Sequence, residues 1–197
     1  MLIRRLPRPD RPRYARHLKR LSEEDRRRRF GRAGVEDGWI DAHVAGLSED
    51  DLILAACRGD EVIAAAHLAL DPASFIAEVG LSVDADQRAG GLGADLLRQA
   101  AVFARNRGAG QLMTLCLSDN RAMVALARRA GMAVAFHPGE AEARLELDPP
   151  DALTVGQEMS TGLFAVFEDW AGLIERYHGL IAAAAQGAAP PSGGAKG

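Results

Sequence analysis

Three apolar runs joined by very short links restrict the fold of this chain more than any other feature. The runs cover residues 51–57, 61–70 and 74–83, and turn-forming pairs of the type Gly-Asp and Asp-Pro separate them. Links this short join antiparallel strands, because a parallel strand needs a long crossover connection. The sequence therefore predicts an antiparallel meander in the middle of the chain.

The hydrophobic period changes directly after the meander. From Leu92 to Phe103, apolar residues recur at helical spacing, and the glycines that follow end this helix. A second helix is expected from Asn120 to Gly131. Its expected apolar face consists of Met123, Leu126, Ala127 and Ala130, and further strands are expected at 111–117, 132–136 and 142–148.

The part of the chain before the meander adds one strand at 2–6 and charged helices between Tyr14 and Gly46. In chain order the pattern is a strand, helices, three antiparallel strands, a helix, a strand, a helix and two strands. This order predicts an α/β (α+β) fold, in which a mixed, mostly antiparallel sheet of about seven strands has helices on its faces.

Charge is divided unevenly along the chain. Residues 1–32 hold thirteen Arg or Lys against four acidic residues, so they carry a formal charge of +9 and the remainder carries −12. The Arg run at 26–29 suits RNA or phosphate ligands, but such a run is most often the solvated face of a helix. Ser22 and the three acidic residues after it predict the N-cap and first turn of that helix. We expect a basic N-terminal face on an acidic body and no nucleic-acid partner.

Beyond Pro149, outside a first domain of residues 1–148, the sequence predicts a helical extension over 149–186 and a disordered tail over 187–197. Apolar residues of the extension are spaced 4, 3, 4, 3 and 4 apart, a stripe that must be buried. Its partner is either the chain's own domain or a second copy in a homodimer. The stripe consists of Leu163, Phe167, Trp170, Ile174, Tyr177 and Ile181.

A glycine-rich segment follows the third run of the meander and opens directly onto a helix. Backbone N–H groups at such a junction converge, and the helix dipole favours an anion, so the segment predicts a phosphate site. A dinucleotide motif that starts at Gly91 would need glycine in place of Leu96, and the Gly-Lys-Ser/Thr of a P-loop is absent. The phosphate site must therefore be of another kind.

Residues 88–93 (RAGGLG) fit the R/Q-x-x-G-x-G/A pyrophosphate loop of the GNAT superfamily of acyl-CoA-dependent N-acetyltransferases. Residues 118–132 resemble the second half-site of that superfamily, an Asn-containing helix that ends at a glycine, and Leu81 with Val83 fits its fourth strand. The resemblance covers residues 2–148, so residues 1–148 are expected to form the acetyltransferase domain.

A more specific resemblance is to the acetyltransferase domain of bacterial protein lysine acetyltransferases. It is carried by LSEEDRRRRF at 21–30, by Ala77-Glu78 and by the Asn-Arg-x-Met pattern at 120–123. That domain is often fused to an acyl-CoA-synthetase-like region, for which a chain of 197 residues has no room.

The resemblance implies acetyl-CoA as the acyl donor. Backbone amides from Arg88 to Ala94 would hold the CoA pyrophosphate, and the edge of residues 81–83 would pair with the pantetheine arm. Two parallel strands, 74–83 and 111–117, would splay to admit the thioester. The implied cofactor-binding residues are Leu81, Ser82, Val83, Arg88, Ala89, Gly90, Gly91, Leu92, Gly93, Ala94, Asn120 and Met123.

Acyl transfer to an amine needs a base, because a free lysine has a pKa of about 10.4 and is charged at neutral pH. Glu78 is the only acid within residues 74–83, and by the resemblance it matches the catalytic glutamate of the lysine acetyltransferases. A glutamate has an ordinary pKa of about 4.3, so the role favours a partly apolar site that raises this pKa. The alternative is a solvent-facing or salt-bridged glutamate.

One position departs from the superfamily. Many members carry a Tyr in the Asn-containing helix that protonates the departing CoA thiolate, and here that position is Ala127. Water or Ser118 would supply the proton, or the thiolate, with a pKa of about 8.5, leaves without one. Cys116 allows an acyl-cysteine intermediate in principle, but a buried structural thiol is favoured.

Other residues exclude several classes of protein. Cys57 and Cys116 lie in apolar runs, so no disulfide is expected, and the five histidines show no metal-ligand spacing, so no metal is expected. Neither a signal peptide nor an apolar stretch of about 20 residues is present, so we expect no membrane span and a cytoplasmic protein.

These features predict an enzyme that moves an acetyl group from acetyl-CoA to a primary amine, preferably a protein lysine, by direct attack in a ternary complex. Acidic residues near the expected mouth, Asp84, Asp86 and Asp119, suit a cationic acceptor. Two alternatives stay open. One is a small-molecule amine acetyltransferase, and the other is a non-catalytic acyl-CoA-binding sensor.

Overall fold

A computed structural model describes residues 2–71, 73 and 75–160. Its core is one mixed sheet with the strand order β1-β2-β3-β4-β5-β7-β6. The strands are β1 (Ile3–Arg5), β2 (Leu52–Arg58), β3 (Glu61–Asp71), β4 (Ile76–Val83), β5 (Gln111–Leu117), β6 (Ala133–His137) and β7 (Glu140–Glu146). The helices are η1 (Arg8–Asp10), α1 (Arg11–Arg20), α2 (Glu23–Phe30), α3 (Asp37–Ala45), η2 (Ala85–Gly90), α4 (Leu92–Asn106) and α5 (Arg121–Arg129).

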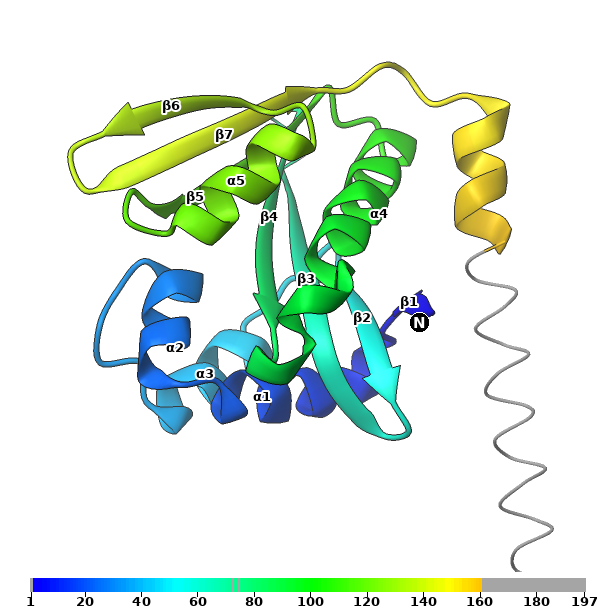
Figure 1. Ribbon diagram of the computed structural model, residues 1–197. Coiled ribbons are helices and arrows are strands. Elements are labelled where there is room, and N and C mark those ends of the chain that lie inside the picture. Colours follow the sequence, from blue (N-terminus) through cyan, green and yellow to red (C-terminus); the bar gives the residue numbers. More distant parts are fainter. Residues whose placement is uncertain (1, 72, 74, 161–197) are drawn as a thin grey trace, which may run out of the picture. The chain divides into compact units, whose positions relative to one another are not determined.

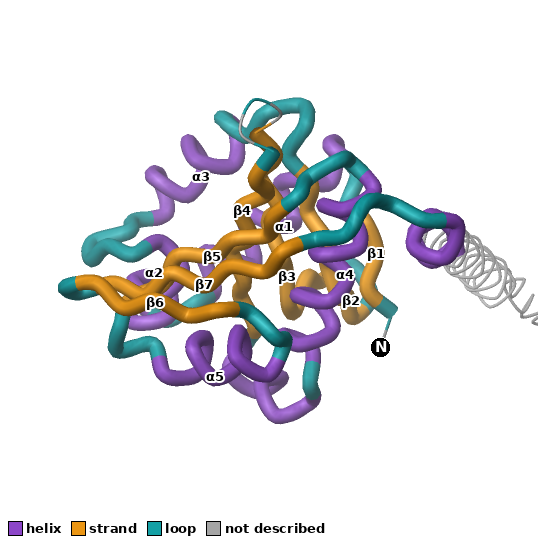
Figure 2. Tube along the Cα trace, turned by 90° about the horizontal axis from the view of Figure 1, so that it is seen from above, coloured by secondary structure: helices purple, strands orange, loops and turns teal. Residues whose placement is uncertain are grey.

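The predicted meander is confirmed, because β2, β3 and β4 are consecutive antiparallel neighbours. Helices cover both faces of this half of the sheet: α4 lies on one side and α1 to α3 on the other, whereas α5 lies against β6 and β7 (Figures 1 and 2). On β2, Leu54 packs in the core with α4, whereas Ile53 packs in the core with α1 and α3. Burial on both faces explains why the strands read as continuous apolar runs instead of alternating ones.

Two strands begin two residues away from their predicted starts, and the other strand starts agree to within one residue. β4 begins at Ile76, not at residue 74, because Phe75 has a positive φ of 55° and cannot be part of an extended strand. β7 begins at Glu140, two residues before the predicted start. A tight turn at Gly139 (φ 84°) brings His137 opposite Glu140, so the hairpin pairs up to its tip.

The buried face of α5 also differs from the expected one. Val124 and Ala127 are buried beneath the helix, whereas Ala130 is exposed. Met123 and Leu126 are only partly buried: they pack against the core on one side and line a cleft on the other. The apolar residues of α5 do recur at helical spacing, but some of them lie in the core and others at the cleft.

Residues 152–160 form a helix tied to the end of α4, where Arg105 pairs with Asp151 and Arg107 with Glu158. The predicted stripe from Leu163 to Ile181 and the predicted tail over 187–197 lie outside the described residues. In the ranges that are described, no helix is both long and apolar enough to cross a lipid bilayer.

Side-chain packing under α4 sets the first prediction. Leu96 is completely buried in the core between α4 and the sheet. Leu96→Ala should lower the free energy of unfolding by about 2–5 kcal/mol, because the lost methyl groups leave a cavity. The same substitution at Leu153, whose side chain is 70% exposed, should change it by less than about 0.5 kcal/mol. Urea denaturation of the two variants measures the difference, and equal losses would contradict this packing.

Candidate functional site

In the described sheet, β4 and β5 are the one parallel pair, and their pairing covers only three residues of each strand. Glu78 is the last paired residue of β4 and lies opposite Met113. Beyond it the strands diverge (Figure 1). The backbone of Leu81–Val83, here called the β4 edge, therefore has no strand neighbour on the β5 side.

A cleft of about 270 Å³ opens beside the β4 edge. Its walls come from β4, from the start of α4, from one face of α5 and from α2. The lining residues are Leu21, Asp25, Arg28, Arg29, Leu81, Ser82, Val83, Arg88, Gly91, Gly93, Ala94, Asn120, Ala122, Met123, Leu126 and Arg129. This set draws together segments that are as much as 108 positions apart in the sequence, from Leu21 to Arg129.

Nine of the residues that the sequence predicted as cofactor-binding line this cleft, and two other described ones, Gly90 and Leu92, do not. Gly90 belongs to η2, as does Ala89, whose side chain is not among the described parts of the structure. The side chain of Leu92 is only 7% exposed and belongs to the core under α4. Any contact of Gly90 or Leu92 with a ligand must therefore use the backbone.

Two glycines shape the turn between η2 and α4. Gly91 has a φ of 78°, in the left-handed region that side-chain-bearing residues avoid, and it ends η2 just before α4 begins. Gly93 lies in the first turn of α4, where a Cβ atom would lie 3.4 Å from Leu126 and 3.9 Å from Val83. The absence of a side chain there leaves the helix backbone open to the cleft.

The cleft receives the N-termini of two helices. α4 begins at Leu92, and α5 begins after Asn120, whose side-chain oxygen accepts a hydrogen bond of 3.2 Å from the backbone N–H of Met123. The first N–H groups of a helix have no helical partner, and the macrodipole makes this end positive. An anionic group such as a pyrophosphate is therefore favoured between the two ends.

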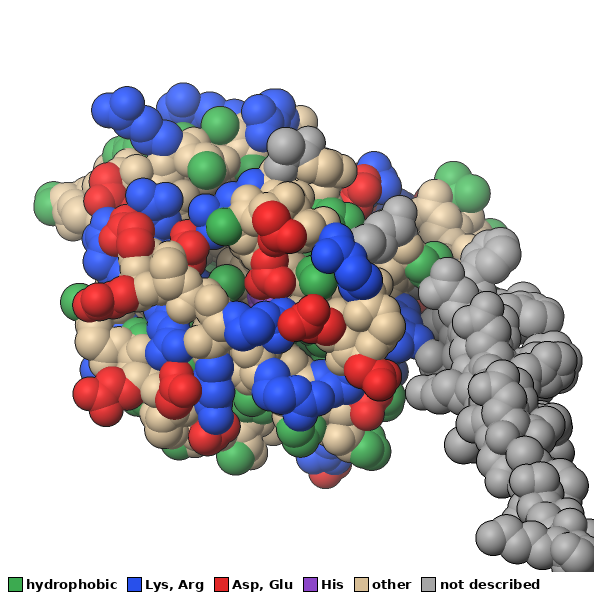
Figure 3. All heavy atoms as spheres, turned by 60° about the horizontal axis from the view of Figure 1, so that its bottom comes forward, with side chains coloured by type: hydrophobic (Ala, Val, Ile, Leu, Met, Phe, Trp, Pro, Cys, Tyr) green, Lys and Arg blue, Asp and Glu red, His purple; other side chains and the backbone are tan. Residues whose placement is uncertain are grey.

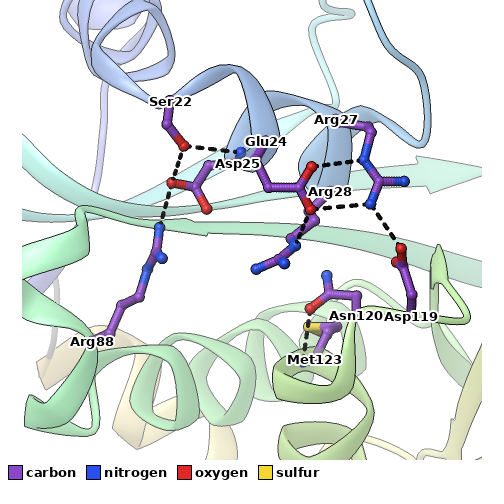
Figure 4. Close-up of polar contacts among 9 residues, drawn as sticks. All are labelled: Ser22, Glu24, Asp25, Arg27, Arg28, Arg88, Asp119, Asn120 and Met123. Atoms are coloured by element: carbon purple, nitrogen blue, oxygen red, sulfur yellow. Dashed lines mark hydrogen bonds and ion pairs between the residues drawn. The ribbon is translucent and has the colours of Figure 1, made fainter.

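Helix α2 is tied to both sides of the cleft, as Figure 4 shows. Arg88 of η2 forms an ion pair of 2.7 Å with Asp25, and Arg27 forms one of 2.8 Å with Asp119 of the loop after β5. Burial raises the pKa of Asp25, but hydrogen bonds from Ser22 and Arg88 outweigh it, so the net pKa is lowered. Asp25 is thus ionised at neutral pH and neutralises Arg88.

The sequence analysis missed the contribution of α2 to the cleft, which consists of Asp25, Arg28 and Arg29. The Arg run at 26–29 is not a solvated face, because all four residues are partly buried. The only available signal was the LSEEDRRRRF segment, and a helical wheel cannot tell which of four consecutive arginines will face a cleft. As predicted, Ser22 caps this helix and accepts a hydrogen bond from the N–H of Asp25.

A buried chain of polar groups fixes the β4 edge to α1. His17 is fully buried; its Nε2 lies 2.9 Å from Oγ of Ser82, and its Nδ1 lies 3.0 Å from a carboxylate oxygen of Asp84. Burial raises the pKa of Asp84, but its contacts with His17 and Arg20 give a net lowering. The edge therefore has a fixed position before any ligand arrives.

Glu78 is exposed and does not line the cleft. Its neighbours Ala77 and Val79 point into the core under α4, so Glu78 and Gly80 lie on the opposite face of β4, toward α1 to α3. The partly apolar surroundings expected for this side chain are not present. It lies at the end of the β4–β5 pairing, where the two strands begin to separate.

Cys116 and Ser118, which were considered as reactive groups, lie outside the cleft lining. So does Ala127, which occupies the position where a proton-donating Tyr was considered. Cys116 is 8% exposed in a small core under α5, and burial raises the pKa of its thiol, which disfavours the reactive thiolate. Ala127 is 1% exposed and belongs to the core. Within the described ranges, no cluster of three His, Cys, Asp or Glu side chains could hold a metal ion.

The chain was compared with protein-family models, with curated proteins and with solved structures. The model of the acetyltransferase (GNAT) family matches residues 15–132. No curated protein matches the sequence. Among solved structures, the GNAT domain of PAT from S. lividans is 25% identical, with 74% of this chain and 89% of that chain covered and a TM-score of 0.64.

Two further structures share the fold at lower identity. The ribosomal-protein-S18-alanine N-acetyltransferase from Escherichia coli is 18% identical, with 76% of this chain and 96% of that chain covered and a TM-score of 0.57. The yncA protein from Salmonella typhimurium, solved with its cofactor acetyl-CoA, is 21% identical, with 77% and 98% covered and a TM-score of 0.52.

The open backbone at Gly93 generates a prediction in which stability and binding change in opposite directions. Gly93→Ala should leave the free energy of unfolding unchanged or raise it by up to about 1 kcal/mol, because Ala favours a helix interior. The added methyl group should weaken acetyl-CoA binding about tenfold or more, as measured by calorimetry. Gly91→Ala is the matched control, because its positive φ should make it lose stability. Unchanged affinity in Gly93→Ala would contradict a ligand at this helix end.

Proposed function

Because this chain belongs to the acetyltransferase (GNAT) family, we propose that it transfers the acetyl group of acetyl-CoA to the ε-amine of a protein lysine. Family membership identifies the chain as an acetyl-CoA-dependent N-acetyltransferase. The choice of lysine rests on the resemblance of residues 21–30 and 120–123 to bacterial protein lysine acetyltransferases. The likeness to the GNAT domain of S. lividans PAT is consistent with it.

One observation carries the proposal: β4 and β5 separate directly after Glu78, and the cleft opens at that point. The N–H and C=O groups of the β4 edge then pair with the amides of the pantetheine arm as a strand would. The thioester at the end of that arm extends toward Glu78. Donor and base therefore meet where the sheet splits.

Donor binding follows from the two helix ends. The pyrophosphate lies at the start of α4, held by backbone amides of the segment Arg88–Ala94, and Asn120 keeps the start of α5 on the opposite wall. Met123 and Leu126 give the cleft an apolar wall for the pantetheine arm. This role accounts for the partial exposure of these two apolar residues on α5.

Chemistry requires a neutral amine, because an ammonium group has no lone pair. Glu78 accepts a proton from the ammonium group directly or through water, and the neutral amine nitrogen then attacks the carbonyl carbon. The carbon–sulfur bond breaks to release CoA as a thiolate, and the nitrogen of the new amide loses its second proton to water. The methyl group of Ala127 cannot protonate this thiolate, and the exposed Glu78 delivers the amine proton to solvent. Any proton that the thiolate takes up therefore comes from water.

An acceptor screen tests the proposed function. The purified protein is incubated with acetyl-CoA and either lysine peptides or small amines, and free CoA is measured with a thiol reagent. We expect CoA release in proportion to peptide, with small amines slower. Release only with small amines would favour the small-molecule alternative. Tight acetyl-CoA binding without acceptor-dependent release would identify a sensor and overturn the proposal.

Substitution of Glu78 tests the base. Glu78→Gln keeps the shape of the side chain but cannot accept the proton, so kcat should fall about 10²- to 10³-fold. The affinity for acetyl-CoA, measured by calorimetry, should stay within about twofold, because Glu78 lies outside the cleft lining. Glu140→Gln, an exposed change at the start of β7, is the control. Unchanged turnover in Glu78→Gln would remove Glu78 from the mechanism.

A further inference from the structure

Arg29 reaches from α2 to the surface of β4 and lines the cleft. Its guanidinium fills the space next to Gly80 that a side chain would otherwise occupy: a Cβ atom at Gly80 would collide with Cζ and Nη1 of Arg29. Gly80 is therefore required for this arrangement. This arrangement places the guanidinium of Arg29 over Gly80, which is two residues from Glu78 on the same face of β4.

Unlike its neighbours, Arg29 has no carboxylate partner within the described part of the chain. Arg26 pairs with Asp37, Arg27 with Glu24 and Asp119, and Arg28 with Glu24. Figure 3, which turns the lower part of Figure 1 toward the reader, shows Arg and Lys side chains interspersed with Asp and Glu. The charge of the Arg run is thus matched locally, with Arg29 as the exception.

The contacts of Arg29 are neutral ones. Its Nη2 donates a hydrogen bond of 3.2 Å to the hydroxyl of Tyr14, and its Cζ lies 5.0 Å from the ring centre of Phe30. Its Nε is buried and has no hydrogen-bond partner among the described residues. A partly buried cation with an unused donor lacks the anion that would normally accompany it.

The positive charge of Arg29 also affects the pKa values of two histidines, His43 and His67. Burial and, after it, the positive charge of Arg29 lower the pKa of His43, and the same two causes bring the pKa of His67 to about 4. Asp51 acts in the opposite direction, but its carboxylate lies 3.5 Å from His67 and pairs with that ring. Neither histidine can serve as a counter-ion.

From this geometry we propose that Arg29 binds a carboxylate of the acceptor, so that the enzyme prefers amines that carry a carboxylate. The proposal rests on the proposed function and deepens it. A guanidinium binds a carboxylate through two parallel hydrogen bonds, which makes it specific for that group. The acceptor brings the missing anion to Arg29 while its amine is presented to Glu78.

Spacing selects the kind of acceptor. Side chains two residues apart on one strand face emerge about 7 Å apart, so Arg29 over Gly80 and Glu78 serve two separated groups of one acceptor. The α-amine and carboxylate of an amino acid are too close together for this. A lysine ε-amine with an acidic neighbour in a peptide, or free lysine with its own carboxylate, provides a suitable separation.

The test compares two peptides of equal length, with lysine flanked by Glu or by Gln, in the acetyl-CoA assay. Wild type should prefer the Glu peptide about tenfold in kcat/KM. Arg29→Gln should lose this preference through a higher KM for the Glu peptide. Arg29→Lys, which keeps the charge but not the two parallel N–H donors, should retain part of the preference. Arg32→Gln, an exposed change outside the cleft lining, should retain all of it.

Peptide affinity for the CoA-saturated protein is measured by calorimetry in parallel, so the preference can be tested without turnover. Free lysine against lysinamide distinguishes a small-molecule carboxylate from a peptide one. Equal affinity and equal kcat/KM for both peptides and for both small amines would overturn the role of Arg29 but leave the proposed function intact. An equal fall of kcat with every acceptor in Arg29→Gln would also overturn it, because Arg29 would then act on the acyl group. If none of the acceptors causes CoA release, the proposed function fails, and this result says nothing about the preference for a carboxylate.

Discussion

The short parallel contact between β4 and β5 is the constraint on which the rest of this structure depends. Three residues of each strand pair, which is enough to keep the sheet continuous from β1 to β6. Beyond Glu78 the strands separate, and the β4 edge keeps the hydrogen-bonding groups of a strand without a strand partner. A sheet that closed completely would bury this edge. The splay therefore opens the cleft, and the proposed positions of the donor and of the base both depend on it.

A buried contact holds this open edge in place. An unpaired edge strand is normally free to twist or to pair with another chain. Here Ser82 is fixed through His17, which is fully buried on α1, and Asp84 holds the other nitrogen of the same ring. The opposite face of the strand is packed on α4 through Val79. The edge is thus rigid before a ligand binds, so little ordering entropy is lost on binding.

Local signals account for what the sequence could predict. The meander follows from short links, the turn before α4 from its glycines, and the starts of α2 and α5 from the caps Ser22 and Asn120. What could not be predicted depends on neighbours distant in the sequence. An apolar residue such as Met123 gives the same helical period whether it faces a core or a cleft. In the same way, four consecutive arginines look alike until Gly80, about fifty positions away, leaves room for one of them.

The position of α2 over the cleft depends on two different kinds of contact, which follow from its composition. The helix has no fully buried residue, and its ties to the two sides of the cleft are partly exposed ion pairs, worth about 0–1 kcal/mol each. Its end is anchored on the other side, because Phe30 packs against Trp39 and His43. The ends of the helix are defined by Ser22 at the start and by Gly31, with a φ of 68°, at the end. Two of the four arginines that line the cleft therefore lie on a helix whose anchoring contacts are on its far side and whose contacts across the cleft are exposed ion pairs.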